Sequence, residues 1–332
     1  MKLYYITSGY RRPIDILDNA LLKALSATSH TFDYFMLNRE PLSALLPRIQ
    51  TFQPDIVVTL CGPKSYIPVH VISELRRLGI ITVIWFADDP YAIDNALSIA
   101  SAYDAVFTID SACIPFYISN SCDKVFHLPL GTDTNIFRPY AVHPSYHSDV
   151  CFIGTGYDNR LRFFKEMLRY LERNIHVRLI GHFWEHVDWS QGCVPLIRSK
   201  WINFTETPRY FNGAKIVLNI HRSEDDTYID KNRAGAPAHS INNRTYDIAA
   251  CNAFQLVDYR VDLPASYEPQ AEIISFESPK EGADQIHQYL HDAEARQHIA
   301  ARAYERTMNC HTFSHRLHRM MTKLEAFIAS SS

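Results

Sequence analysis

A short polar segment in the second half of the chain combines the residue types that bind a diphosphate. It begins with Asn242, Asn243 and Arg244, continues to Asp247, and leads into an apolar run. An arginine in the first turn of a helix pairs well with a diphosphate, and neighbouring asparagines add hydrogen bonds. Asp247, one turn later, can accept hydrogen bonds from ribose hydroxyls. We therefore predict a nucleotide-binding helix that begins near Arg244, against the alternative of an ordinary surface helix with the same first turn.

A second candidate anion site lies in a glycine-containing turn. Residues 150–153 form an apolar run, Gly154 and Gly156 follow it, and a helical pattern begins near Arg160. In a strand, turn and helix of this kind, free backbone N–H groups and the helix dipole face the point where a phosphate docks. The third glycine of a dinucleotide fingerprint is missing. The turn therefore fits a phosphate site and a purely structural start of a domain equally well.

Two adjacent carboxylates, Asp88 and Asp89, follow the apolar run at residues 80–87. Open α/β sheets present their ligand-binding groups at the carboxyl ends of strands. We predict Asp88 as a catalytic or acceptor-orienting carboxylate, with Asp89 as its substitute. The alternative is an N-cap before Pro90, in which the carboxylate only starts a helix.

Further candidates give weaker indications. His311, His315 and His318 share one helical face, but no carboxylate accompanies them as in an HExxH motif, so no metal site is predicted. Trp184 follows a strand-like run and can stack on a nucleobase, although a large aromatic residue there is more often packing.

The elements that must position these residues alternate along the whole chain. Strand-like runs at residues 3–7, 32–37, 56–60, 81–86, 105–109 and 124–128 are separated by helical patterns, and a second series occupies 150–153, 177–180, 216–220, 254–257 and 273–276. Such alternation is typical of α/β proteins with parallel sheets. It stops in the proline-containing stretch 138–145, which predicts a domain boundary. We expect a Rossmann-like domain at 1–143, a second Rossmann-like domain at 144–312, and a final helix at 313–332 that packs back toward the first domain.

The composition is that of a globular protein, since 47% of the 332 residues are hydrophobic and 21% are charged. The formal net charge of -3 gives no reason to expect nucleic acid as a partner. The longest apolar run is far shorter than the roughly 20 residues of a membrane helix, so we predict no transmembrane segment. Seven cysteines, an odd number without a CxxC pair, favour a reducing cytoplasm.

These residues resemble a known family. The stretch 244–260, together with 311–316, is similar to the CgeB-like spore maturation proteins, which are grouped with family 4-type glycosyltransferases. Residues 128–133, 137–139 and 152–160 extend the likeness, which spans 80–320. The resemblance implies a GT-B fold with two Rossmann-like domains that face a central cleft. It also implies a nucleotide-diphosphate sugar, of the UDP type, held by the second domain, with no separate cofactor and no obligatory metal.

Two positions depart from the family pattern. Asp247 falls where family 4-type enzymes carry the second, ribose-binding glutamate of their E-x7-E motif, whereas His239 falls at the place of the first. A histidine cannot replace a carboxylate toward a sugar hydroxyl in the same way. Asn252 stands where glycine is usual after the helix cysteine, and asparagine can adopt the same left-handed backbone.

The resulting prediction is a glycosyltransferase that moves a hexose or N-acetylhexosamine to a saccharide or protein acceptor. Arg244, together with Arg160 and the turn at 154–156, would neutralise the leaving diphosphate, and Asp88 would position the acceptor. The resemblance favours a retaining outcome. A sugar-nucleotide epimerase of the same architecture and a non-catalytic nucleotide-sugar-binding protein of a surface-assembly pathway are the alternatives. A metal-binding Asp pair of a GT-A enzyme is disfavoured by the second α/β domain.

Overall fold

The computed structural model describes residues 1–11, 15–186, 188–189, 192–225 and 231–331, which divide into two compact units. Unit 1 consists of Met1–Leu130, Thr227–Ser240 and Phe313–Ser332, and unit 2 of Gly131–Asp226 and Ile241–Thr312. The division after Leu130 precedes the boundary predicted after residue 143. The reason is packing, because Phe137 is buried against Phe204 and Phe211 of unit 2.

Unit 1 is built on a parallel six-stranded sheet in the order β2-β1-β3-β4-β5-β6. All six strands predicted from the first series of apolar runs are present: β1 (Lys2–Ile6), β2 (Thr31–Phe35), β3 (Ile56–Cys61), β4 (Ile81–Phe86), β5 (Ala105–Thr108) and β6 (Val125–His127). Strands β3, β4 and β5 are buried almost throughout, as expected for central strands with helices on both faces.

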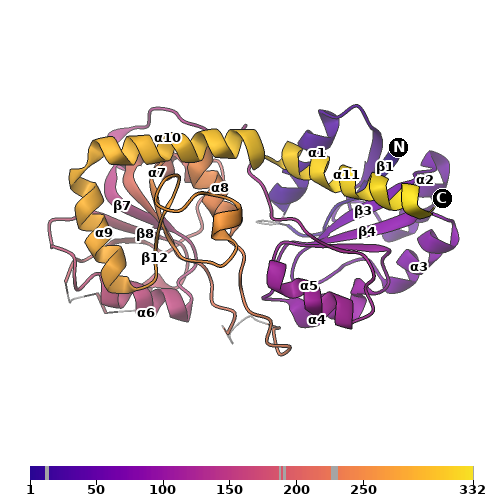
Figure 1. Cartoon of the computed structure of the whole chain (residues 1–332), viewed down its shortest axis with the longest axis horizontal. Helices are drawn as coiled ribbons and strands as arrows, with labels where there is room; N and C mark the ends of the chain where they lie inside the picture. Colours follow the sequence, from indigo (N-terminus) through magenta and orange to yellow (C-terminus); the bar gives the residue numbers. More distant parts are fainter. Residues whose placement is uncertain (12–14, 187, 190–191, 226–230, 332) are drawn as a thin grey trace. The chain divides into compact units, whose positions relative to one another are not determined.

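Helices cover both faces of this sheet (Figure 1). One face packs against α2 (Leu45–Phe52), α3 (Val69–Arg77), α4 (Ile93–Ala100) and α5 (Ile114–Ser119). The other face packs against α1 (Asp15–Ser26) and α11 (Phe313–Ser331), which lie side by side. The predicted return of the final helix to the first unit is therefore confirmed.

Unit 2 repeats this architecture with the order β12-β11-β10-β7-β8-β9, again parallel. Its strands are β7 (Ser148–Ile153), β8 (Val177–Ile180), β9 (Leu196–Arg198), β10 (Ala214–Asn219), β11 (Gln255–Asp258) and β12 (Ile274–Phe276). Helices α6 (Asp158–Met167) and α9 (Pro279–His291) share a core on one face, α7 (Thr207–Gly213) and α8 (Asn243–Ala250) lie on the other, and α10 (Ala293–Cys310) packs against α8. The α/β class with two Rossmann-like units is confirmed.

The strand order of unit 2 fixes where a ligand can bind. The chain runs outward from β7 to β8 and β9, then returns to β10 on the opposite side of β7. In open parallel sheets, ligands bind at the carboxyl ends of strands beside such a reversal. The residues that follow Ile153 of β7 and Asn219 of β10 are therefore the natural candidates for a binding site.

The long segment before α8 belongs partly to unit 1. The Asp94 carboxylate accepts hydrogen bonds from the backbone N–H groups of Arg233 and Ala234, and Asp110 accepts from those of His239 and Ser240. Ala236, between these two anchors, is fully buried in the core of unit 1. Residues 231–240 are thus held by two carboxylates rather than by secondary structure.

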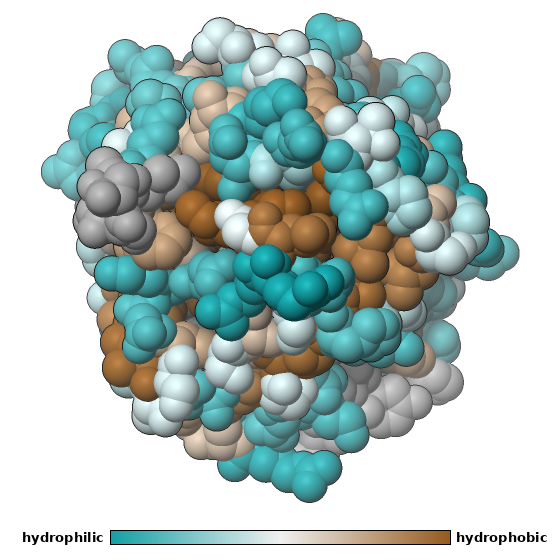
Figure 2. Space-filling model, turned by 90° about the vertical axis from the view of Figure 1, so that its right-hand side faces the viewer, coloured by the Kyte–Doolittle hydropathy of each residue, from teal (hydrophilic) through white to brown (hydrophobic). Residues whose placement is uncertain are grey.

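The surface of unit 1 in Figure 2 is mainly hydrophilic, with a strip of hydrophobic residues across its middle. Across the ranges that the structure describes, no helix combines the length and apolarity that crossing a membrane requires. The seven cysteines, which all lie in those ranges, form no disulfide bond.

The packing of α11 on unit 1 can be tested by truncating one buried side chain. Met320 is fully buried between the sheet and α1, so Met320→Ala should lower the free energy of unfolding by about 2–5 kcal/mol. Lys323, one turn away and exposed, provides the control, and Lys323→Ala should change it by less than about 0.5 kcal/mol. Urea denaturation measures both, and equal stabilities would contradict the docked position of α11.

Candidate functional site

Three arginines gather on two aromatic rings at the carboxyl end of β7. The Arg160 guanidinium lies 5.4 Å from the ring centroid of Phe152 and 5.1 Å from that of Tyr157. Arg244 lies 5.2 Å from the Phe152 centroid, and Arg222 lies 4.8 Å from the Tyr157 centroid. The negative ring faces stabilise these cations. Three positive charges around two rings form a site suited to an anion.

Arg244 carries the strongest electrostatic indication of an anion. It is half-buried in the first turn of α8, and its Nη1 donates to Oδ1 of Asn219 at 3.2 Å. Burial, followed by repulsion from Arg160, lowers the pKa of Arg244 to about 9. A bound diphosphate would relieve both effects, because it neutralises the two guanidinium groups together.

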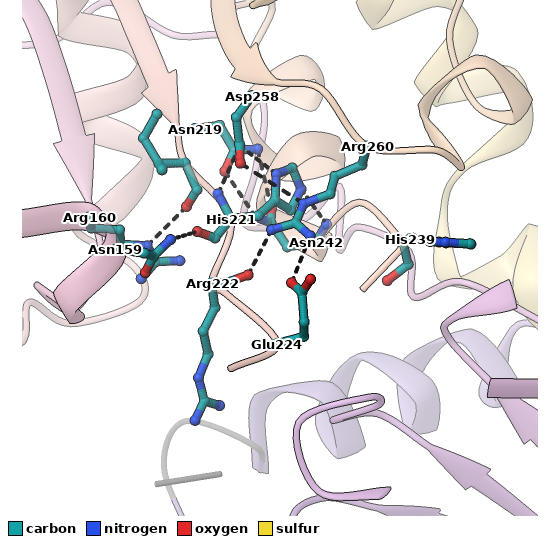
Figure 3. Close-up of polar contacts among 12 residues, drawn as sticks. Asn159, Arg160, Asn219, His221, Arg222, Glu224, His239, Asn242, Asp258 and Arg260 are labelled. Carbon is teal, nitrogen blue, oxygen red and sulfur yellow. Dashed lines mark hydrogen bonds and ion pairs between the residues drawn. The ribbon is translucent and has the colours of Figure 1, made fainter. Parts of the chain in front are cut away.

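The side chain of Arg160 is more buried than that of Arg244 and binds backbone carbonyl groups. It is 4% exposed, and its Nε and Nη1 donate to the backbone carbonyls of Ile220 (3.0 Å) and Thr155 (2.9 Å). Asn159 adds a bond from Nδ2 to the carbonyl of His221 at 3.0 Å (Figure 3). The start of α6 is thereby tied to the segment after β10. A direct contact of Arg160 with the donor stays a prediction.

Asn242 is the N-cap residue of α8, which confirms a helix that begins near Arg244. Its Oδ1 accepts from the backbone N–H of Thr245 at 3.2 Å. The side-chain amides of Asn242 and Asn219 also exchange two hydrogen bonds, of 3.0 and 3.2 Å. The side-chain amide of Asn242 is thus used to start the helix and to bind Asn219. The predicted phosphate contacts of Asn242 and Asn243 stay predictions.

Asp247 is 4% exposed and binds within unit 2. Its Oδ1 accepts from Oγ1 of Thr132 at 2.8 Å, and its Oδ2 accepts from Nδ2 of Asn243 at 3.2 Å. Burial raises the pKa of Asp247 to about 8, against the opposing effects of Thr132 and Arg244. The side chain thus connects residues 131–133 to α8. Its contact with a ribose stays a prediction.

The turn at residues 154–156 was predicted as a candidate phosphate site, and the structure shows how its two glycines are used within the protein. The N–H groups of Gly154 and Gly156 donate to the carbonyls of Ile180 and His182, both at 2.8 Å, so these two N–H groups are already used within the protein. A Cβ at Gly154 would lie 3.0 Å from Nη2 of Arg244. A side chain at this position would therefore require the guanidinium of Arg244, or the equally close ring of Phe152, to shift. Whether Gly154 and Gly156 contact the nucleotide stays a prediction.

Trp184 packs in the core. It is fully buried, its Nε1 donates to the carbonyl of Gly154 at 2.9 Å, and its ring lies against Phe152 and Phe164. The alternative interpretation, packing, is confirmed over stacking on a base. Trp201, which follows β9, is 54% exposed.

The two carboxylates of unit 1 lie in different environments. Asp89 is 1% exposed and accepts hydrogen bonds from Oγ1 of Thr108 (2.6 Å) and the hydroxyl of Tyr117 (2.8 Å). Burial raises the pKa of Asp89 to about 7. Neither residue is the N-cap of α4, which is Ala92, so that alternative is wrong. The catalytic role stays a prediction, for which the half-buried Asp88 is more accessible than Asp89.

The remaining candidates are placed as follows. The Nε2 of His311 lies 2.9 Å from the carbonyl of Ser266, and its ring packs between Tyr246 and Tyr267. Among the described residues, no three His, Cys, Asp or Glu side chains are grouped to hold a metal ion. Asn252 has φ 52°, which confirms the left-handed backbone expected where relatives carry glycine.

A buried cluster beside Arg244 was missed by the sequence interpretation. His221 follows β10, Asp258 ends β11, and Arg260 lies two residues beyond it (Figure 3). Arg260 donates from Nη2 to the carbonyl of Arg222 at 2.7 Å. No periodicity marks residues 221–243, so no signal in that stretch distinguishes His221 from its neighbours.

Two parallel sheets of six strands, each flanked by helices, place the chain in the GT-B class, and solved structures agree. Sucrose-phosphate synthase from Thermosynechococcus elongatus superposes with a TM-score of 0.67 at 11% identity, with 99% of this chain and 100% of that chain covered. Anabaena HepE, solved in complex with UDP-glucose, gives 0.64 at 11% identity, with 98% and 100% covered. These likenesses concern the fold alone.

The sequence then defines the family. Residues 160–322 match the family described as glycosyl transferase-like. The chain is 30% identical to spore protein CgeB of Bacillus subtilis (strain 168) over an alignment of 324 residues, which covers 94% of this chain and 95% of that protein. It belongs to the family of CgeB, as its resemblance implied.

The raised pKa of Asp89 gives a test in stability. The buried carboxyl keeps its proton up to about pH 7, whereas in the unfolded chain it ionises near its ordinary pKa of 3.8. The stabilisation is complete below pH 3.8 and is lost as the pH rises through about 7. As the pH rises from 3.8 to about 7, the free energy of unfolding of wild type should therefore fall relative to that of Asp89→Asn. Above pH 7 the difference between the two proteins should stay constant. Urea denaturation from pH 4 to 9 measures this, and exposed Asp123→Asn should follow wild type. Parallel curves for Asp89→Asn and wild type would refute the assignment.

Proposed function

We propose that this protein is a glycosyltransferase that uses a UDP-sugar and binds its diphosphate at Arg244. The observation that carries the proposal is the half-buried guanidinium of Arg244, repelled by Arg160 and held at the start of α8 by Asn219. Two neighbouring guanidinium groups, one of them in the first turn of a helix, lie beside the strand reversal of a parallel sheet and are suited to the pyrophosphate of a nucleotide sugar.

The chemistry follows from the leaving group. The oxygen of the acceptor hydroxyl forms a bond to the anomeric carbon of the sugar and loses its proton to water. The bond from that carbon to the β-phosphate oxygen breaks, and the nucleoside diphosphate leaves with its electron pair and the added negative charge. Arg244, with the charges of Arg160 and Arg222 nearby, would stabilise this charge as it develops. Asp88 is the carboxylate that we assign to orienting the acceptor hydroxyl.

The finer assignments rest on the same site. HepE is solved with UDP-glucose, which supports a UDP donor and a hexose or N-acetylhexosamine as the transferred group. Three guanidinium groups supply the positive charge that a divalent metal supplies elsewhere, which supports metal-independent, family 4-like transfer. The acceptor in this proposal is a saccharide or a protein, and the reaction takes place in the cytoplasm.

His239 in place of the family glutamate favours one alternative, a protein that binds a nucleotide sugar without turnover. A nucleotide screen followed by an assay distinguishes the two. A nucleotide sugar at 100 times its dissociation constant should stabilise the protein by about 2.7 kcal/mol. Incubation with saccharide acceptors should then release free nucleoside diphosphate. Stabilisation without release would favour the binding protein, a changed nucleotide sugar without acceptor would favour an epimerase, and no stabilisation by any nucleotide would refute the site.

The role of Arg244 is tested by its removal. Arg244→Ala should weaken binding of UDP-glucose about 10- to 100-fold, because a hydrogen bond to a charged group contributes about 1.5–3 kcal/mol. Arg173→Ala, an exposed arginine of the same unit, is the control and should bind as wild type does. Isothermal titration measures the dissociation constants. Unchanged affinity in Arg244→Ala would move the diphosphate away from α8.

A further inference from the structure

The buried imidazole of His221 joins the carboxyl ends of two strands. Strands β10 and β11 are parallel neighbours, with Asn219 paired to Val257, so His221 and Asp258 come out side by side. Oδ1 of Asp258 accepts from the backbone N–H of His221 at 2.8 Å and contacts its Nδ1 at 2.6 Å (Figure 3). His221 is 1% exposed. Its ring is therefore fixed from one side by a carboxylate.

The other ring nitrogen defines the protonation state. Nε2 of His221 accepts from the backbone N–H of Asn242 at 3.1 Å. A backbone N–H can only donate, so Nε2 carries no proton, and the single ring proton lies on Nδ1, which donates it to Asp258. The imidazole is neutral. Burial lowers the pKa of His221, in agreement with this assignment.

The residue that His221 holds is the one that starts α8. Asn242 caps the helix and exchanges two hydrogen bonds with Asn219, and Asn219 in turn accepts from Nη1 of Arg244. A continuous chain of hydrogen bonds thus runs from Asp258 through His221, Asn242 and Asn219 to Arg244. Displacement of the Asn242 backbone would disturb both the cap and the orientation of the guanidinium.

We propose that His221 is a positioning residue for donor binding, whose unprotonated Nε2 fixes the start of α8 and thereby Arg244. The inference rests on the proposed function, since it concerns the same diphosphate. It assigns to His221 no contact with the substrate. Its effect is exerted through the acceptor atom that it offers to the N–H of Asn242.

The proposal entails a pH dependence of donor affinity. Protonation would place an N–H of the ring against the N–H of Asn242 and would add a cation among the charged groups around the ring. The charged groups that act on the ring are Asp258 and Arg260 after β11 and Arg244 on α8. Glu224 after β10 pairs with Arg260, and Arg160 on α6 binds the carbonyl of Ile220, next to His221 in the chain. Burial lowers the pKa of His221 below its ordinary value of 6.5, so protonation and the loss of affinity that it causes should begin only below pH 6.5.

Two substitutions of His221 distinguish the role of its hydrogen-bond acceptor, Nε2, from the role of the other ring atoms. In His221→Gln, the side-chain oxygen can reach the position of Nε2 and accept from Asn242, but it does not titrate. In His221→Asn, the amide can replace only Nδ1 and donate to Asp258, so the bond to Asn242 is lost. UDP-glucose is the probe, because its phosphodiester groups, unlike the terminal phosphate of UDP, do not titrate near pH 6.

At pH 7.5, His221→Asn should weaken UDP-glucose binding about 5- to 30-fold, as expected for a lost helix cap, and His221→Gln less than about 3-fold. As the pH falls below 6.5, wild type should lose affinity and His221→Gln should not. Hydrogen exchange of the first turn of α8 without ligand should be faster in His221→Asn alone.

Equal affinities and equal exchange in wild type and His221→Asn would overturn the proposal. Equal losses in both variants would also overturn it, because the ring would then act only through packing. If wild type and Arg244→Ala bind UDP-glucose equally, the diphosphate site that the proposed function places at Arg244 is refuted. If Arg244→Ala loses binding and His221→Asn does not, only the inference about His221 fails.

Discussion

The concentration of guanidinium charge on the rings of Phe152 and Tyr157 is the constraint around which the carboxyl edge of the second sheet is built. Like charges this close repel, so each arginine needs a fixed partner. Arg160 takes backbone carbonyls, and Arg244 takes the amide of Asn219. Gly154 also helps to accommodate Arg244, since a methyl group at this position would crowd the guanidinium. The glycine at position 154 and the carbonyl groups bound by Arg160 are therefore both explained by the arginine side chains at this edge of the sheet.

The neutral polar residues of unit 2 support this arrangement. Asn219, Asn242 and Thr245 satisfy one another's donors and acceptors, so a buried polar layer lies between β10 and α8 without a net charge of its own. Networks of this kind are stable only when every member is paired, because a buried polar group without a partner costs free energy. The start of α8 is thus specified by several bonds at once, which gives a charged side chain on its first turn a defined direction.

The sequence predicted the sheets well because their strands are long apolar runs. It missed β9, a three-residue edge strand whose side chains remain partly or fully exposed. The helix at Arg244 was predicted from its polar first turn, which is local information. The roles of Gly154, Asp247 and Trp184 depend on partners that lie 26 to 115 positions away, such as Thr132 for Asp247, and no local pattern indicates them. His221 was missed for the same reason, since its partners come from two separate elements.

Unit 1 is assembled from three stretches of the chain, the last of which is α11. During synthesis, residues 313–331 leave the ribosome after every strand of both sheets has been made. Until then, the face of the first sheet that α11 covers keeps an incomplete hydrophobic core, with Leu21 and Trp85 among its exposed members. Unit 2, whose helices and strands all precede residue 313, can close its core earlier. The order of folding is therefore expected to run opposite to the order of the units along the chain, and a nascent protein depends on its final helix to bury the first sheet.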